Sequence, residues 1–212
     1  MRKLFLVLAL LAGAAAPAAA ATEIPNIMVL DAQTASRQGD YGTALDLYTR
    51  ALDSGELNQT MTIAALNGRG LVYYRLRQWL QAIDDFTQAL GLKPDNATVL
   101  RNRCFAFIEL REWGYAIDDC RASAELVPND PQSADTLGYV YLRQGRYEDA
   151  IAHFNGALAI DPNYGPAYLH RGMAYYSLGN RQQGRDDLLM AQSLMPGNKE
   201  VEAQLRRYGL IP

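Results

Sequence analysis

The chain has 212 residues, of which 49% are hydrophobic and 20% charged, a composition typical of folded globular proteins and unlike that of disordered chains. Its formal net charge is −3 at pH 7, and Lys and Arg do not form a basic run. These charges argue against a nucleic-acid partner and against direct binding to an anionic membrane, so we expect membrane contact only through a protein partner.

The N-terminus has the organisation of a secretory signal peptide. Arg2 and Lys3 precede the apolar run LFLVLALLAGAAA, and the small residues PAAAAT follow it. We predict a signal peptide over residues 1–21, cleaved near Ala20 or Ala21. An uncleaved anchor is the alternative, although the apolar run is short for a membrane span. The Ala-rich end favours a bacterial signal, so we expect export, with the periplasm as the destination.

A pattern recurs every 34 residues through the rest of the chain, the kind of period that identifies repeat architectures. Each unit has small residues at two positions, large aromatic residues beside them and a proline at its end. The columns are Gly70, Cys104, Gly138 and Gly172; Tyr73, Phe107, Tyr141 and Tyr175; Trp79, Trp113 and Tyr147, with Arg181 as the exception; Ala82, Ala116, Ala150 and Gly184; and Pro94, Pro128, Pro162 and Pro196.

Apolar spacings of three and four residues predict two amphipathic helices in each unit, and proline stops the second of them. Small residues let the two helices approach closely. A weaker unit precedes these four, with its first helix from about Ile27 to Arg37. After Pro196, Val201, Leu205 and Tyr208 share one face of a predicted capping helix. The fold class is therefore all-α.

These columns resemble the tetratricopeptide repeat (TPR) family. The resemblance implies a right-handed superhelical solenoid of helix-turn-helix repeats, with a concave groove made by the first helix of each unit. It also implies a binding module without enzymatic activity, so we expect no cofactor. The expected boundaries are repeats at about 25–58, 63–96, 97–130, 131–164 and 165–198, followed by a capping helix at about 199–208.

The two cysteines of the chain lie in one hairpin. Cys104 and Cys120 are each eight residues from Glu112, near which the turn is centred. At a rise of about 1.5 Å per residue both lie roughly 12 Å from the turn, level with each other on antiparallel helices. Other units have a Gly opposite a large residue in these columns. We predict a disulfide, with two buried thiols as the alternative.

Arginines and acidic pairs occur together in three repeats. Arg69, Arg103 and Arg171 accompany Asp84–Asp85, Asp118–Asp119 and Asp186–Asp187, whereas the fourth repeat has Leu137 in the arginine column and Ala152–His153 in place of the acids. We predict structural ion pairs across each hairpin, namely Arg69 with Asp85, Arg103 with Asp119 and Arg171 with Asp187. The alternative is that the acids form a solvated helix face.

A second face of each first helix would line the groove of a TPR-like stack. Its residues form an apolar stripe with polar points, which is typical of a partner site. The predicted groove residues are Asn67, Leu71, Tyr74, Arg101, Asn102, Phe105, Ile108, Asp135, Tyr139, Leu142, Leu169, His170, Met173 and Tyr176.

The sequence contains no recognisable catalytic or metal-binding motif. His153 and His170 lie in different repeats and lack a paired ligand spacing, so we expect no metal. The sequence predicts a non-enzymatic scaffold that holds an extended protein or peptide segment in its groove, in the bacterial cell envelope. The alternative is a self-associating module, for example a homodimer, whose groove is filled by its own chain or by a second copy.

Overall fold

The computed structural model describes residues 18–212, which fold into eleven α-helices and form no strand. The helices are α1 (Ala18–Gln38), α2 (Tyr41–Asp53), α3 (Gln59–Arg75), α4 (Trp79–Leu92), α5 (Ala97–Glu109), α6 (Trp113–Leu126), α7 (Pro131–Gln144), α8 (Tyr147–Ile160), α9 (Gly165–Ser177), α10 (Arg181–Leu194) and α11 (Lys199–Arg207). The predicted all-α solenoid with a capping helix is confirmed.

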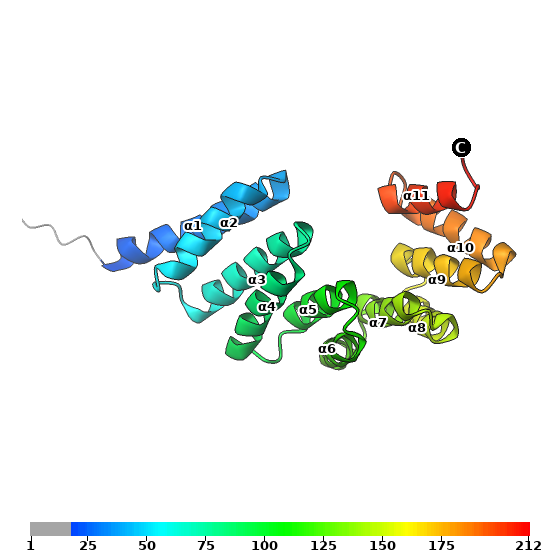
Figure 1. Cartoon of the computed structure of the whole chain (residues 1–212), viewed down its shortest axis with the longest axis horizontal. Coiled ribbons are helices and arrows are strands. Elements are labelled where there is room, and N and C mark those ends of the chain that lie inside the picture. The colour runs from blue at the N-terminus through cyan, green and yellow to red at the C-terminus, as the bar shows by residue number, and fades with distance from the viewer. Residues whose placement is uncertain (1–17) are drawn as a thin grey trace, which may run out of the picture.

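The helices form five antiparallel hairpins that stack along an open arc (Figure 1). Each odd-numbered helix from α1 to α7 contacts the next odd-numbered helix as well as its hairpin partner, and α11 packs against α9 and α10. The odd-numbered helices therefore form one layer, the inner layer, and the even-numbered helices form the outer layer. Because a single hairpin cannot bury its own apolar face, the core is a series of clusters within and between neighbouring hairpins.

Close contact within a hairpin depends on the small residues of the repeat. A Cβ atom added at Gly70 would lie 2.6 Å from Cε1 of Phe86, and one at Gly138 would lie 2.6 Å from Cε1 of Phe154. Both phenylalanines are completely buried. The glycine column therefore provides the space for the aromatic ring of the second helix.

Polar caps start the first helices of most repeats. The side chains of Asn58, Asn96 and Asp130 accept hydrogen bonds from backbone N–H groups in the first turns of α3, α5 and α7. Asn198 does the same for α11, accepting from Glu200 and Val201. These caps end each loop at a defined residue and thereby set where the next inner helix begins.

Helix α1 differs from its prediction. It begins at Ala18, whereas the sequence pattern placed its start near Ile27. The alanines at its start favour helix strongly, and the helix continues through Pro25. The predicted signal peptide, residues 1–21, lies mostly outside the described residues and stays a prediction. None of the helices from Ala18 onward combines the length and hydrophobicity needed to traverse a bilayer.

Candidate functional site

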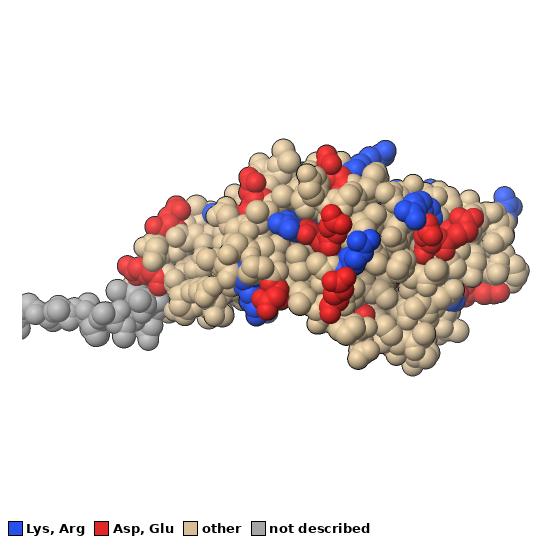
Figure 2. All heavy atoms as spheres, turned by 90° about the horizontal axis from the view of Figure 1, so that it is seen from below, with Lys and Arg blue, Asp and Glu red and all other residues tan. Residues whose placement is uncertain are grey.

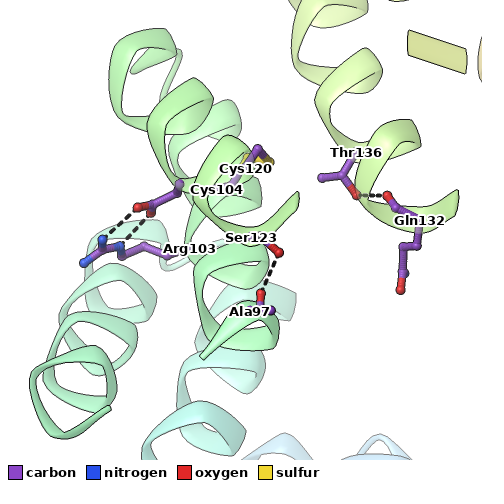
Figure 3. The surroundings of a disulfide bond; sticks show 8 residues. Ala97, Arg103, Cys104, Cys120, Ser123, Gln132 and Thr136 are labelled. Atoms are coloured by element: carbon purple, nitrogen blue, oxygen red, sulfur yellow. Dashed lines mark hydrogen bonds and ion pairs between the residues drawn. A yellow bond between two sulfur atoms is a disulfide. The ribbon is translucent and has the colours of Figure 1, made fainter. Parts of the chain in front are cut away.

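Three features hold the inner helices in place, and the first is a disulfide. Cys104 on α5 and Cys120 on α6 are bonded, with their Cα atoms 5.6 Å apart (Figure 3). Both residues are buried in a cluster with Ile108, Ala116 and Val140. The bond replaces the glycine–phenylalanine contact of the neighbouring hairpins and links the inner and outer layers at the middle of the stack.

The second feature is a bidentate ion pair in three hairpins. Arg69, Arg103 and Arg171 each donate from Nε and Nη2 to both carboxylate oxygens of Asp85, Asp119 and Asp187, at 2.7–2.9 Å. Figure 3 shows the Arg103 pair beside the disulfide. All three aspartates are buried, so the solvated-face alternative does not hold for them. Paired forks of this kind are strong and geometrically specific.

The same arginines also contact the preceding hairpin. Nη1 donates to Thr49 from Arg69, to Thr87 from Arg103 and to Asn155 from Arg171, at 3.1, 3.1 and 2.6 Å. Each guanidinium therefore joins three helices instead of the two that the sequence predicted.

The third feature is a set of polar contacts between successive inner helices. Asn102 on α5 donates to the side-chain oxygen of Asn67 on α3 at 2.8 Å. Arg143 on α7 lies 3.0 Å from Glu109 on α5 and 3.0 Å from the hydroxyl of Tyr139. Arg101 lies 3.8 Å from Asp130. These contacts set the register between hairpins from the groove side.

The inner helices line a pocket of about 240 Å³ that runs across the groove. It takes one residue from each of five inner helices, α3, α5, α7, α9 and α11: Tyr74, Phe105, Tyr139, His170 and Glu200. Four of these were predicted groove residues, and the structure brings them together although they lie as far as 96 positions apart in the sequence.

The pocket is largely aromatic. The ring centres of Phe105 and Tyr139 are 6.1 Å apart, and those of Tyr139 and His170 are 4.9 Å apart, with tilted planes. Burial raises the pKa of Tyr74 to about 12, so its phenol stays protonated at neutral pH. The pocket thus offers apolar ring faces together with hydroxyl groups.

His170 is held by a buried carboxylate. Its Nδ1 lies 2.9 Å from Asp135 on α7, and the His170 side chain is only 14% exposed. Burial alone lowers the pKa of His170, but the charge and hydrogen bond of Asp135, with a smaller contribution from Glu200, outweigh it and leave the pKa raised. The structure therefore couples one side of the pocket to a titratable pair.

The two ends of the groove differ: the N-terminal end has a further pocket, and the C-terminal end is partly covered. Between α1 and α3 lies a pocket of about 370 Å³, lined by Gln33, Ser36, Arg37, Tyr48, Ala64, Asn67, Gly68 and Leu71. At the other end, Tyr208 stacks on Tyr176 with 3.8 Å between ring centres and 7° between planes. The chain's own C-terminal segment therefore covers part of the groove at Tyr176.

Four predicted groove residues are unavailable to a partner. Ile108, Leu142 and Leu169 are 0%, 8% and 3% exposed, and Asp135 is 5% exposed. Ile108 and Leu142 share a column with Tyr74 and Tyr176, but these shorter aliphatic side chains stay between hairpins. Leu169 packs on α11 through the cluster containing Val201 and Leu205. Asp135 instead positions His170.

The remaining predicted residues are partly exposed on the inner layer, including Met173, which packs against two core clusters. The sequence interpretation missed Glu109, Arg143 and Glu200. Glu109 and Arg143 lie four positions after Phe105 and Tyr139, so a longer helical column would have included them. Glu200 belongs to the capping helix, and no repeat column indicates it.

Figure 2 shows one face of the molecule, seen from below relative to Figure 1. Acidic and basic residues are interspersed there, without a large region of one sign. Within residues 24–212, no group of three His, Cys, Asp or Glu side chains is placed to hold a metal ion.

Comparison with known families agrees with this geometry. Residues 63–96 match the tetratricopeptide repeat, and residues 138–179 match a TPR repeat. The chain is a tetratricopeptide repeat protein. Such TPR repeats form protein-interaction scaffolds, generally without catalytic activity.

Solved structures share the TPR fold at low identity. YrrB, a TPR protein with an unusual peptide-binding site, is 21% identical over 84% of this chain and 90% of its own, with a TM-score of 0.58. A MamA protein is 21% identical over 90% and 98% of the two chains, with a TM-score of 0.63. MamA from Desulfovibrio magneticus RS-1 is 16% identical over 84% and 98%, with a TM-score of 0.67.

Proposed function

We propose that this TPR protein binds an extended peptide or protein segment along its inner groove. The observation that carries the proposal is the pocket formed by Tyr74, Phe105, Tyr139, His170 and Glu200, one residue from each inner helix from α3 to α11. Aromatic side chains with polar tips are typical anchors at protein interfaces. The peptide-binding site described for YrrB supports the same class of ligand.

A segment in this groove would meet recognition groups at successive positions. Leu71, 37% exposed, lies at the N-terminal pocket, and the aromatic pocket follows along the inner layer. The Asn67–Asn102 and Glu109–Arg143 contacts hold these helices in register before binding. Preorganised side chains reduce the entropy lost on association.

Site-specific photo-crosslinking tests the groove. A photoreactive phenylalanine analogue at Phe105 is expected to capture a protein partner, and the same analogue at Leu80 is not. Leu80 is the matched control because it is 67% exposed on α4, in the outer layer. Adding Leu71→Asp to the Phe105 probe is expected to reduce capture at least fivefold. Equal capture from both positions would contradict groove binding.

Export to the periplasm is the second part of the proposal. The signal-peptide pattern and the Cys104–Cys120 bond support it, because disulfides persist in oxidising compartments. Alkylation of the protein from periplasmic extract without reductant, followed by mass spectrometry, is expected to find neither cysteine labelled. Two labelled cysteines, or recovery only from the cytoplasmic fraction, would argue against export.

Self-association remains the second candidate, and one observation favours it. Ile24, Ile27 and Leu30 on α1 are 57%, 52% and 55% exposed at the N-terminal end of the stack. A second copy could cover them. Under this candidate, light scattering is expected to show a particle larger than a monomer for the wild-type protein and a monomer for Ile27→Asp. A monomeric wild-type protein would exclude self-association.

A further inference from the structure

A pocket outside the central groove lies between the start of α10 and the end of α11. It holds about 490 Å³ and is lined by Tyr176, Arg181, Gln182, Arg185, Arg207, Tyr208 and Leu210. Three arginines from two helices converge on it, and no acidic residue is among its lining residues. This concentration of one sign contrasts with the formal charge of −3 for the whole chain.

Two of these arginines break the repeat. The column of Arg181 has a large aromatic residue in the three preceding repeats, and the column of Arg185 has isoleucine in all three. The aromatic residues are Trp79, Trp113 and Tyr147, and the isoleucines are Ile83, Ile117 and Ile151. In those repeats the isoleucines pack against the core clusters. Two neighbouring apolar columns have thus changed to arginine together.

The position of this repeat at the end of the stack explains only part of the change. Because α11 is a short capping helix, the two columns have no full hairpin to pack against, and polar residues are expected there. Neutral or acidic side chains would be polar enough for these two positions, so the end of the stack does not by itself explain two arginines. Like charges four residues apart on a helix repel, and basic residues at a helix N-terminus oppose its dipole.

The pocket arginines also lack the partners that other arginines have. Arg69, Arg103 and Arg171 each bind both oxygens of an aspartate. Within the described part of the chain, the side chains of Arg181, Arg185 and Arg207 have no such ion pair or hydrogen bond. Arg207 instead lies over the ring of Tyr208, with 5.7 Å from its Cζ to the ring centre.

From these observations we propose that this pocket binds the phosphate group of an organic phosphate. Guanidinium groups match phosphate oxygens in charge and in geometry, and three arginines line this one cavity. The stacked rings of Tyr176 and Tyr208 form an apolar wall on which the organic part of the ligand rests. The phosphate belongs either to a soluble molecule or to a lipid headgroup, and this chemistry is common to both.

Binding to two probes with the same headgroup tests the proposal and separates the sources. The probes are glycerol phosphate, followed by calorimetry, and phosphatidylcholine vesicles with and without phosphatidic acid, followed by flotation. Wild-type protein is expected to bind at least one of them. Arg181→Gln with Arg185→Gln is expected to weaken binding at least tenfold, and Arg185→Lys less, because lysine keeps the charge and loses the fork.

A control with the same change in net charge isolates the pocket. Arg50→Gln with Arg121→Gln removes two arginines that are more than half exposed elsewhere on the surface. This control is expected to bind within twofold of wild type, and both double variants are expected to melt like wild type. Binding of vesicles alone identifies a lipid source, and binding of glycerol phosphate a soluble one. Failure to bind either probe, or equal loss in both double variants, overturns the proposal.

Discussion

Adjacent aspartates in this chain have opposite roles, and the phase of the helix separates them. Asp119 is 7% exposed and accepts two hydrogen bonds from Arg103 across the hairpin. The side chain of Asp118, one position earlier, is 75% exposed and lies 3.9 Å from Arg121 on its own helix. Successive residues on a helix are rotated by about 100°, so Asp119 faces the partner helix and pairs with Arg103, whereas Asp118 points into solvent.

This difference predicts unequal effects of the same substitution. Asp119→Asn is expected to lower the free energy of unfolding by about 2–3 kcal/mol, because the partly buried Arg103 loses the charged partner of its bidentate ion pair. Asp118→Asn, the matched control, is expected to change it by less than about 0.5 kcal/mol. Urea denaturation measures both. A double-mutant cycle with Arg103→Met that finds no coupling to Asp119 would contradict the assignment.

The pair of His170 and Asp135 predicts a pH-dependent stability. Despite its burial, His170 has a pKa raised above the ordinary value of 6.5, because Asp135 favours the protonated imidazole. The stabilisation of the fold by protonated His170 is therefore complete below pH 6.5 and is lost as the pH rises through the folded-state pKa. The stability advantage of wild type over His170→Gln is therefore expected to be larger at about pH 5.5 than at about pH 8.5. Denaturation curves at both values test this, and an advantage that grows with pH would refute it.

At the scale of elements, each hairpin turn uses one residue in the left-handed conformation. Gly39, Gly145 and Gly179 occupy this position in the first, fourth and fifth hairpins, with φ between 81° and 83°. Arg77 and Arg111 occupy it in the second and third, each with φ of 61°. The left-handed region costs a non-glycine residue about 1–2 kcal/mol. Two of the five turns are therefore locally strained, and glycine, which stands at this position in the other three turns, would relieve the strain.

Replacing arginine by glycine at these turns is expected to stabilise the protein. Arg111→Gly should raise the free energy of unfolding by about 0.5–1 kcal/mol, since the relief of strain exceeds the added chain entropy of glycine. Gly145→Ala, the converse change in the next repeat, should lower it by about 1 kcal/mol. Thermal melting of both variants provides the measurement. Destabilisation by Arg111→Gly would show that its side chain matters more than its backbone.

At the scale of the whole molecule, the two ends of the stack are finished differently. Helix α11 closes the C-terminal end with Val201 and Leu205, which are 1% and 0% exposed, while Glu200 on the same helix lines the central pocket. The N-terminal end leaves Ile24, Ile27 and Leu30 on the surface. A solenoid depends on its terminal units for solubility, so the C-terminal cap supports the hairpins before it.

Shortening the buried side chain of the cap is expected to destabilise the C-terminal hairpins. Leu205→Ala should cost about 2–4 kcal/mol, because Leu205 is fully buried with Leu169, Leu188 and Ala191. Leu189→Ala removes the same atoms from a leucine that is 39% exposed on α10 and should cost less than about 1 kcal/mol. Hydrogen exchange should show faster amide exchange in α9–α10 for Leu205→Ala, and equal effects of the two changes would contradict this role.

The repeating sequence was sufficient to determine the hairpins and their internal contacts. The period of 34 residues fixes which helix face meets the partner helix, so Gly70 against Phe86, Cys104 against Cys120 and Arg103 against Asp119 follow from comparing columns. These contacts lie between helices that a short turn joins. Their geometry therefore depends on local rise and rotation, which the sequence contains.

Only the tertiary structure decided which inner residues reach the groove. Tyr74 lines the central pocket, whereas Ile108 in the same column is buried, and Glu200 enters from the capping helix. The grouping of Arg181 and Arg185 with Arg207 likewise required the placement of α11 on α10. The physical reason is that exposure in a solenoid depends on how each hairpin is displaced on the next. That displacement results from many contacts between residues far apart in the chain, so it cannot be predicted from any single column of the repeat.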